Sequence, residues 1–103
     1  MANNIIRKLN KAYVAQMEKA ALKGEPFDGV LIEKAVGRFY NSVSVFDKED
    51  VDEVISRFKR MLSIYNKAIN ESDADLLHSI NLQHCRTMLS LAITTLENIK
   101  NKM

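Results

Sequence analysis

The stretch that decides the fold runs from Leu76 to Ile99 and reads LLHSINLQHCRTMLSLAITTLENI. Its apolar residues recur at helical spacing, without a Gly or Pro to interrupt them. On a helical wheel they cover roughly 260°, and only a narrow wedge is wholly polar. A helix at the edge of a monomeric bundle needs an apolar arc of only about 100–150°. The sequence therefore predicts a long helix that is either central, with several neighbours, or also packed against another molecule.

Whether the other helices can cover the whole apolar arc depends on how their lengths compare with the length of this helix. At residues 73–100 it would span about 42 Å, whereas the three helices before it would span about 24 to 33 Å. Shorter neighbours would leave one edge of the apolar arc uncovered, at four residues: Leu82, Leu89, Ile93 and Leu96. Because an exposed apolar patch usually marks an interaction site, these residues are our candidate interface for a homodimer or another protein partner. Complete burial within one chain is the alternative.

Three further amphipathic helices precede this one. Apolar residues recur at three- and four-residue steps over residues 4–23, 30–45 and 48–69. Together with residues 73–100, these segments predict an all-α fold, a compact bundle of four mostly antiparallel helices. At 103 residues, the chain is expected to form a single domain, residues 1–103.

Turn and cap residues indicate where the helices begin and end. Gly24 is a natural stop for the first helix, because glycine takes the left-handed conformation without steric cost. Asp28 can cap the second helix, and Ser72 with Asp75 three residues later resembles a capping box for the fourth. The alternating SVSVF of residues 42–46 leaves an extended segment as an alternative to the end of the second helix.

An acidic run, FDKEDVDE at residues 46–53, raises the question of a metal site. A calcium loop needs an oxygen ligand at its fifth position and Gly at its sixth, but counting from Asp47 these are Val51 and another acid. As a helix start the run is simpler to explain, because Asp47 can cap the first turn and the following acids favour its positive end. We therefore predict a helix N-terminus, in which Glu53 pairs with Arg57.

The residues with reactive side chains form no arrangement that predicts catalysis. His84 and Cys85 are adjacent, but neighbours on a helix point about 100° apart, so we interpret Cys85 as a small core residue. His78 and His84 are six residues apart, whereas a helical metal pair needs three or four. The sequence also lacks a Gly-rich phosphate loop and a nucleophile elbow. We predict a non-enzymatic protein without catalytic residues, metal or cofactor.

Composition favours a globular chain in a reducing compartment. Apolar residues make up 47% and charged residues 27% of the sequence, which is ordinary for a soluble domain. The single Cys85 cannot form an internal disulfide, and no apolar run approaches the roughly 18 residues of a membrane span. The N-terminal MANNIIRKLNK does not have the pattern of a secretion signal. We expect a cytoplasmic protein with no membrane partner.

Positive charge is concentrated at the start of the chain. The net charge of +2 is too small for a dedicated nucleic-acid binder, but residues 1–24 hold five Lys and Arg against one Glu. Four of these cations lie opposite the apolar stripe of the first helix and form our candidate face for an anionic partner: Arg7, Lys8, Lys11 and Lys19. A solvated surface is the simpler interpretation of this face.

Three functional hypotheses follow. Small bundles without a catalytic constellation act by presenting surfaces, so the first is a protein-interaction module of bacterial or phage style. It would be a regulator, inhibitor, adaptor or chaperone that binds and occludes a protein partner. The second is a nucleic-acid-binding accessory protein that uses the basic face of the first helix. The third is an immunity protein against a toxin or bacteriocin.

Overall fold

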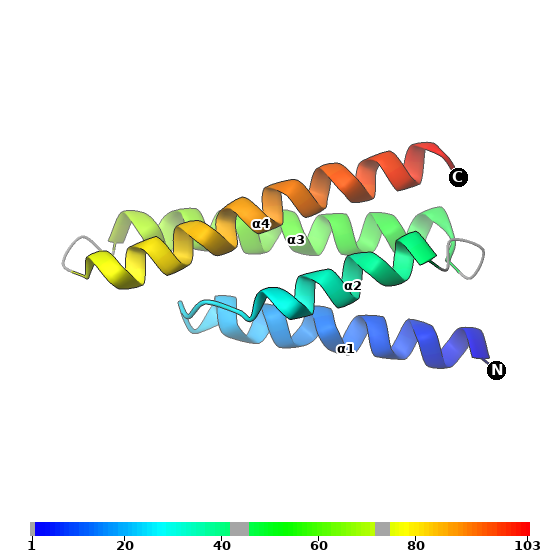
Figure 1. Cartoon of the computed structure of the whole chain (residues 1–103), viewed down its shortest axis with the longest axis horizontal. Helices are drawn as coiled ribbons and strands as arrows, with labels where there is room; N and C mark the ends of the chain where they lie inside the picture. The colour runs from blue at the N-terminus through cyan, green and yellow to red at the C-terminus, as the bar shows by residue number, and fades with distance from the viewer. Residues whose placement is uncertain (1, 42–45, 72–74) are drawn as a thin grey trace.

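The computed structural model describes residues 2–41, 46–71 and 75–103, and within them every regular element is a helix. The four helices follow one another along the chain as α1 (Ala2–Leu22), α2 (Gly29–Asn41), α3 (Lys48–Glu71) and α4 (Leu76–Asn101). Figure 1 shows them as two antiparallel hairpins, α1 with α2 and α3 with α4. The predicted all-α bundle of four helices is confirmed.

The two hairpins pack side by side to close the bundle. The most extensive packing is between α3 and α4, while α1 also contacts α3 and α2 also contacts α4. Because the chain direction alternates, α1 runs parallel to α3 and α2 runs parallel to α4 (Figure 1). With 26 residues, α4 is long as predicted, but with α3 and α2 as neighbours it lies at a corner of the bundle rather than in its centre.

Local sequence determines the turn that follows α1. Gly24 has a φ of 68°, in the left-handed region that glycine adopts without strain. The Gly24 amide donates to the Ala21 carbonyl at 3.0 Å, and the Glu25 amide donates to the Ala20 carbonyl at 3.0 Å. These two bonds form a Schellman motif, which satisfies carbonyls that the end of a helix would otherwise leave open. The predicted stop is confirmed.

An aspartate caps the second helix of each hairpin, α2 and α4. The Asp28 carboxylate accepts a hydrogen bond from the Val30 amide at 3.0 Å, as predicted for the cap of α2. The Asp75 carboxylate accepts a hydrogen bond from the His78 amide at 3.0 Å, so Asp75 caps α4, which begins at Leu76. Ser72 and residues 42–45 lie outside the described residues.

The core is built from large side chains of all four helices. The largest fully buried ones include Met17, Phe39, Phe58, Met61, Tyr65, Leu82, Leu89 and Leu96. Phe27, in the linker between α1 and α2, is also buried and packs edge-on against Tyr65 with ring centroids 5.8 Å apart. Phe27 therefore anchors the linker to the core, while its neighbours Glu25, Pro26 and Asp28 remain exposed.

Candidate functional site

The predicted interface of α4 is part of the core. Leu82, Leu89 and Leu96 are fully buried and Ile93 is only 8% exposed, all within one chain. The expectation that these four residues would be left uncovered is wrong. The reason is that α3 extends to Glu71 and has 24 residues, so at about 36 Å it nearly matches the 39 Å of α4. The alternative of complete burial within one chain holds for this edge of the arc.

Other apolar residues of α4 remain exposed. Leu76, Leu77, Ile80 and Leu91 all expose half or more of their surface. On the helical wheel they alternate with polar neighbours such as His84, Thr87 and Asn98, whereas the polar residues on the buried edge, His78 and Lys100, lie only near the two ends of the helix. That difference in the polarity of neighbouring wheel positions is the signal that could have separated the exposed edge from the buried one.

Part of this exposed edge forms one wall of a groove between α2 and α4. The groove has a volume of about 640 Å³, and we call it the α2–α4 groove. Its apolar surface includes Val30 and Val36 from α2 and Met88 and Leu91 from α4. Leu91 is 66% exposed and Val30 is 47% exposed, so the wall keeps apolar surface in contact with water. Covering such apolar surface with a partner lowers the free energy, because the surface is removed from water.

Two glycines shape the α2 side of the groove. At Gly29, a Cβ would lie 3.1 Å from the Met88 sulfur, so the missing side chain allows Met88 to lie close to α2. At Gly37, a Cβ would meet nothing within 4 Å. Both glycines line the groove. On the α2 side of the groove, no side chain therefore fills the space next to Gly37.

A second hollow continues the groove toward the end of the chain. It has a volume of about 440 Å³ and is lined by Tyr40, Thr95, Asn98, Ile99 and Lys102. Thr95 lines both hollows, so they adjoin on one face of the molecule. The two ends differ in charge, because Asp28 and Glu33 border the α2–α4 groove whereas Lys102 borders the second hollow.

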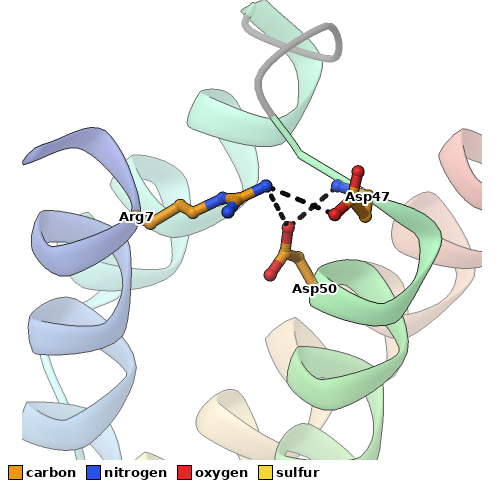
Figure 2. Close-up of polar contacts among 3 residues, drawn as sticks. All are labelled: Arg7, Asp47 and Asp50. Carbon is orange, nitrogen blue, oxygen red and sulfur yellow. Dashed lines mark hydrogen bonds and ion pairs between the residues drawn. The ribbon is translucent and has the colours of Figure 1, made fainter. Parts of the chain in front are cut away.

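The predicted anionic-partner face is divided between two environments. Lys8, Lys11 and Lys19 are exposed, as the sequence predicts. Arg7 instead reaches toward the start of α3, where its Nη2 lies 3.4 Å from Asp47 Oδ2 and 3.2 Å from Asp50 Oδ2 (Figure 2). Arg7 therefore joins α1 to α3 and does not belong to the free basic surface. The sequence did not show this, because Arg7 and Asp47 are forty residues apart.

The acidic run begins α3, but its cap differs in detail from the prediction. The Asp47 carboxylate accepts a hydrogen bond from Arg7, not from an amide of the first turn. The Asp50 carboxylate accepts from the Asp47 amide at 2.8 Å, which is the returning half of a capping box (Figure 2). Glu49 and Asp50 lie in the first turn, where acids complement the helix dipole. The run thus starts a helix and also anchors α1.

The second ion pair across these helices involves Arg57. Its guanidinium donates through Nε and Nη2 to the two carboxylate oxygens of Glu18, with 3.0 Å from Nε to Oε2. The predicted partner Glu53 does not take this contact. The hydrogen bond from Arg57 holds the pKa of Glu18 below its usual value, and the same bond raises the pKa of Arg57, as the charge of Glu53 also does. The side-chain bond outweighs the opposing effect of burial on both groups.

Cys85 is a core residue, as predicted. It is buried, and its thiol donates a long hydrogen bond of 3.7 Å to the Phe27 carbonyl. Burial raises the pKa of the Cys85 thiol, which keeps it in the unreactive protonated form. The neighbouring His84 is exposed and lines the α2–α4 groove. The two side chains do not form a thiol–imidazole pair.

Within the described residues, no three His, Cys, Asp or Glu side chains are grouped so that they could hold a metal ion. None of the described helices is both long and apolar enough to cross a membrane. Comparisons with protein-family models, with curated proteins and with solved structures found no match for this chain.

Proposed function

We propose that the protein is a small non-enzymatic interaction module that binds and occludes a protein partner through the α2–α4 groove. A regulator, inhibitor, adaptor or chaperone acts in this way, and an immunity protein that covers a toxin is a special case. The observation that carries the proposal is the groove itself, whose walls keep Val30 and Leu91 exposed beside Met88. A partner that covers these side chains removes apolar surface from water, which is the main driving force of protein association.

The test is capture of a partner from the native host with two matched variants. Leu91→Glu places a charge in the groove, and we expect it to release the partner that the wild type retains. Ser90→Glu places the same charge on the adjacent exposed residue, about 100° around the helix, and we expect it to retain the partner. Mass spectrometry of the captured proteins identifies the partner. A partner retained equally by all three proteins would refute the groove as the binding surface.

Self-association is a second part of the proposal, with a surface different from the predicted one. The α3–α4 hairpin extends past α1 and α2 at the end where α4 begins (Figure 1). Leu76, Leu77 and Ile80 are exposed on α4 near this end. We propose that the chain forms a homodimer that pairs these residues about a two-fold axis. Light scattering should then show a dimer that Ile80→Glu converts to a monomer, whereas a wild type that is monomeric at high concentration would refute it.

Nucleic-acid binding is the alternative, and one observation favours it. Lys8, Lys11 and Lys19 are exposed on α1, and among the described residues none of the three forms an ion pair. Free cations can neutralise phosphates and release counterions. If this function holds, binding of double-stranded DNA should weaken steeply with salt, and changing the three lysines to Gln should lower the slope by about three. No binding by the wild type at low salt would exclude it.

A further inference from the structure

We propose that the occupant of the α2–α4 groove is an amphipathic helix of the partner that carries basic side chains beside its apolar face. This inference rests on the proposed function, because it specifies the chemistry of the partner that the groove binds. Three features of the groove support it: its length, the sign of the charges along its edge, and the open space next to Gly37.

The length and the walls of the groove suit one short helix. Along α4 the lining residues extend from His84 to Thr95, a distance of about 16 Å and therefore three helical turns. Two parallel helices form the walls, with Val30 and Val36 on one side and Leu91 on the other. An amphipathic helix fills such a groove with anchors at i, i+3 or i+4, and i+7, and a further anchor at i+11 extends the set over the same 16 Å.

The charges at the groove favour a basic occupant. Its charged lining residues are Asp28 and Glu33, and its lining contains no Lys or Arg. Glu33 is exposed and forms no ion pair within the described part of the chain, so its charge is available to a partner. Asp28 is also exposed, but its carboxylate caps α2 and is partly offset by the positive end of that helix. Glu33 is therefore the main determinant of charge preference.

Gly37 offers a way to close the groove without disturbing the fold. It lines the groove, and a Cβ built there meets nothing within 4 Å. Leu is a good helix former, so Gly37→Leu should keep α2 intact while its side chain occupies the open space. An occupant that lies in the groove must contact or displace that side chain. The variant therefore separates binding in the groove from binding elsewhere.

The experiment uses two synthetic peptides of about 14 residues as probes. Both carry Leu at helical i, i+4, i+7 and i+11 positions; one has Lys on each flank of that stripe, and the other has Glu at the same places. Fluorescence anisotropy measures their binding to the full chain at low salt. We expect the Lys peptide to bind about fivefold more tightly than the Glu peptide, since two exposed charge pairs each contribute modestly.

Two variants locate the effect. Asp28→Asn with Glu33→Gln removes both charges, and since Asn caps a helix as well as Asp, the fold should be kept and the preference for the Lys peptide lost. Gly37→Leu should weaken both peptides at least about tenfold, with circular dichroism confirming an unchanged helix content. Equal binding of the two peptides, no binding of either, or full binding to Gly37→Leu would overturn the inference.

Failure of this inference can be told apart from failure of the proposed function. If Leu91→Glu releases the captured partner but the peptides show no charge preference, the groove binds a partner of another chemistry and only the inference fails. If Leu91→Glu retains the partner, the proposed function fails as well. If light scattering shows a dimer that Gly37→Leu dissociates, a second copy occupies the groove, and the inference is again overturned.

Discussion

Gly24 and Gly37 lie in the same hairpin but should respond in opposite ways to alanine. At Gly37 the backbone is helical and a Cβ has free space, so Gly37→Ala should raise the free energy of unfolding by about 0.5–1 kcal/mol. At Gly24 the φ of 68° disfavours any Cβ, so Gly24→Ala should lower it by about 1 kcal/mol. Urea unfolding of both variants measures the two effects. A stabilised Gly24→Ala would mean that the turn after α1 can take another conformation.

The ion pair between Glu18 and Arg57 should make stability depend on pH. The pKa of Glu18 is lowered in the folded chain by the Arg57 hydrogen bond, from a usual value of 4.5. A lowered carboxyl pKa adds stability that is fully present above the usual value and is lost as the pH falls through the folded one. Stability should therefore fall as the pH drops below about 5, and it should fall less steeply in Glu18→Gln. Thermal unfolding between pH 3 and pH 7 measures both, and parallel curves would contradict the assignment.

At the scale of one helix, the same substitution at two nearby positions of α4 should have very different effects on stability. Leu89→Glu puts a charge into a fully buried position and should unfold the protein, with a cost of about 3 kcal/mol or more. Leu91→Glu, two residues further, lies at a position that is 66% exposed and should change stability by no more than about 0.5 kcal/mol. Melting curves followed by circular dichroism compare the two. A folded Leu89→Glu would show that α4 is not packed against α3 as described.

The cations of α1 should likewise differ in how much their loss lowers the stability of the protein. Arg7→Gln removes a guanidinium that contacts Asp47 and Asp50, so it should lower stability by about 0.5–1 kcal/mol. Lys8→Gln and Lys11→Gln change exposed side chains and should have no measurable effect. Chemical unfolding of the single variants tests this difference. The four cations cannot be treated as one surface, because only the lysines can be neutralised without weakening the contact between α1 and α3.

These helices show how far sequence alone could go. The stop at Gly24 and the cap at Asp28 were predicted, because each depends on residues within a few positions along the chain. The partners of Arg7 and Arg57 were not, since the structure brings them from about forty residues away. A local rule selected Glu53 for Arg57, and a tertiary contact with Glu18 replaced it. The exposed edge of α4 was missed partly for the same reason, because the length and position of α3 also decide which edge is covered.

At the scale of the whole molecule, the two contacts between the hairpins differ in character. The contact between α1 and α3 carries ion pairs, from Arg7 to Asp50 and from Arg57 to Glu18. The contact between α2 and α4 leaves apolar side chains exposed beside the α2–α4 groove. The ion pairs add polar contacts between α1 and α3, whereas the groove between α2 and α4 keeps apolar surface accessible to a partner. The proposed binding surface therefore lies on the side of the molecule opposite to the ion pairs between α1 and α3, beside buried residues such as Ile32 and Ala92.

Side chains of α3 and α4 contact the linker between α1 and α2, and these contacts bear on the order of folding. The Tyr65 hydroxyl donates to the Glu25 carbonyl at 2.7 Å, and His78 Nε2 lies 3.0 Å from the Gly24 carbonyl oxygen, across forty and fifty-four residues. Each hairpin can form from contacts that are close in sequence, which are made early, whereas these bonds require both hairpins to have docked. Tyr65→Phe should accordingly leave the folding rate unchanged and accelerate unfolding, a low φ-value in stopped-flow kinetics. A slower folding rate would instead place the linker in the folding nucleus.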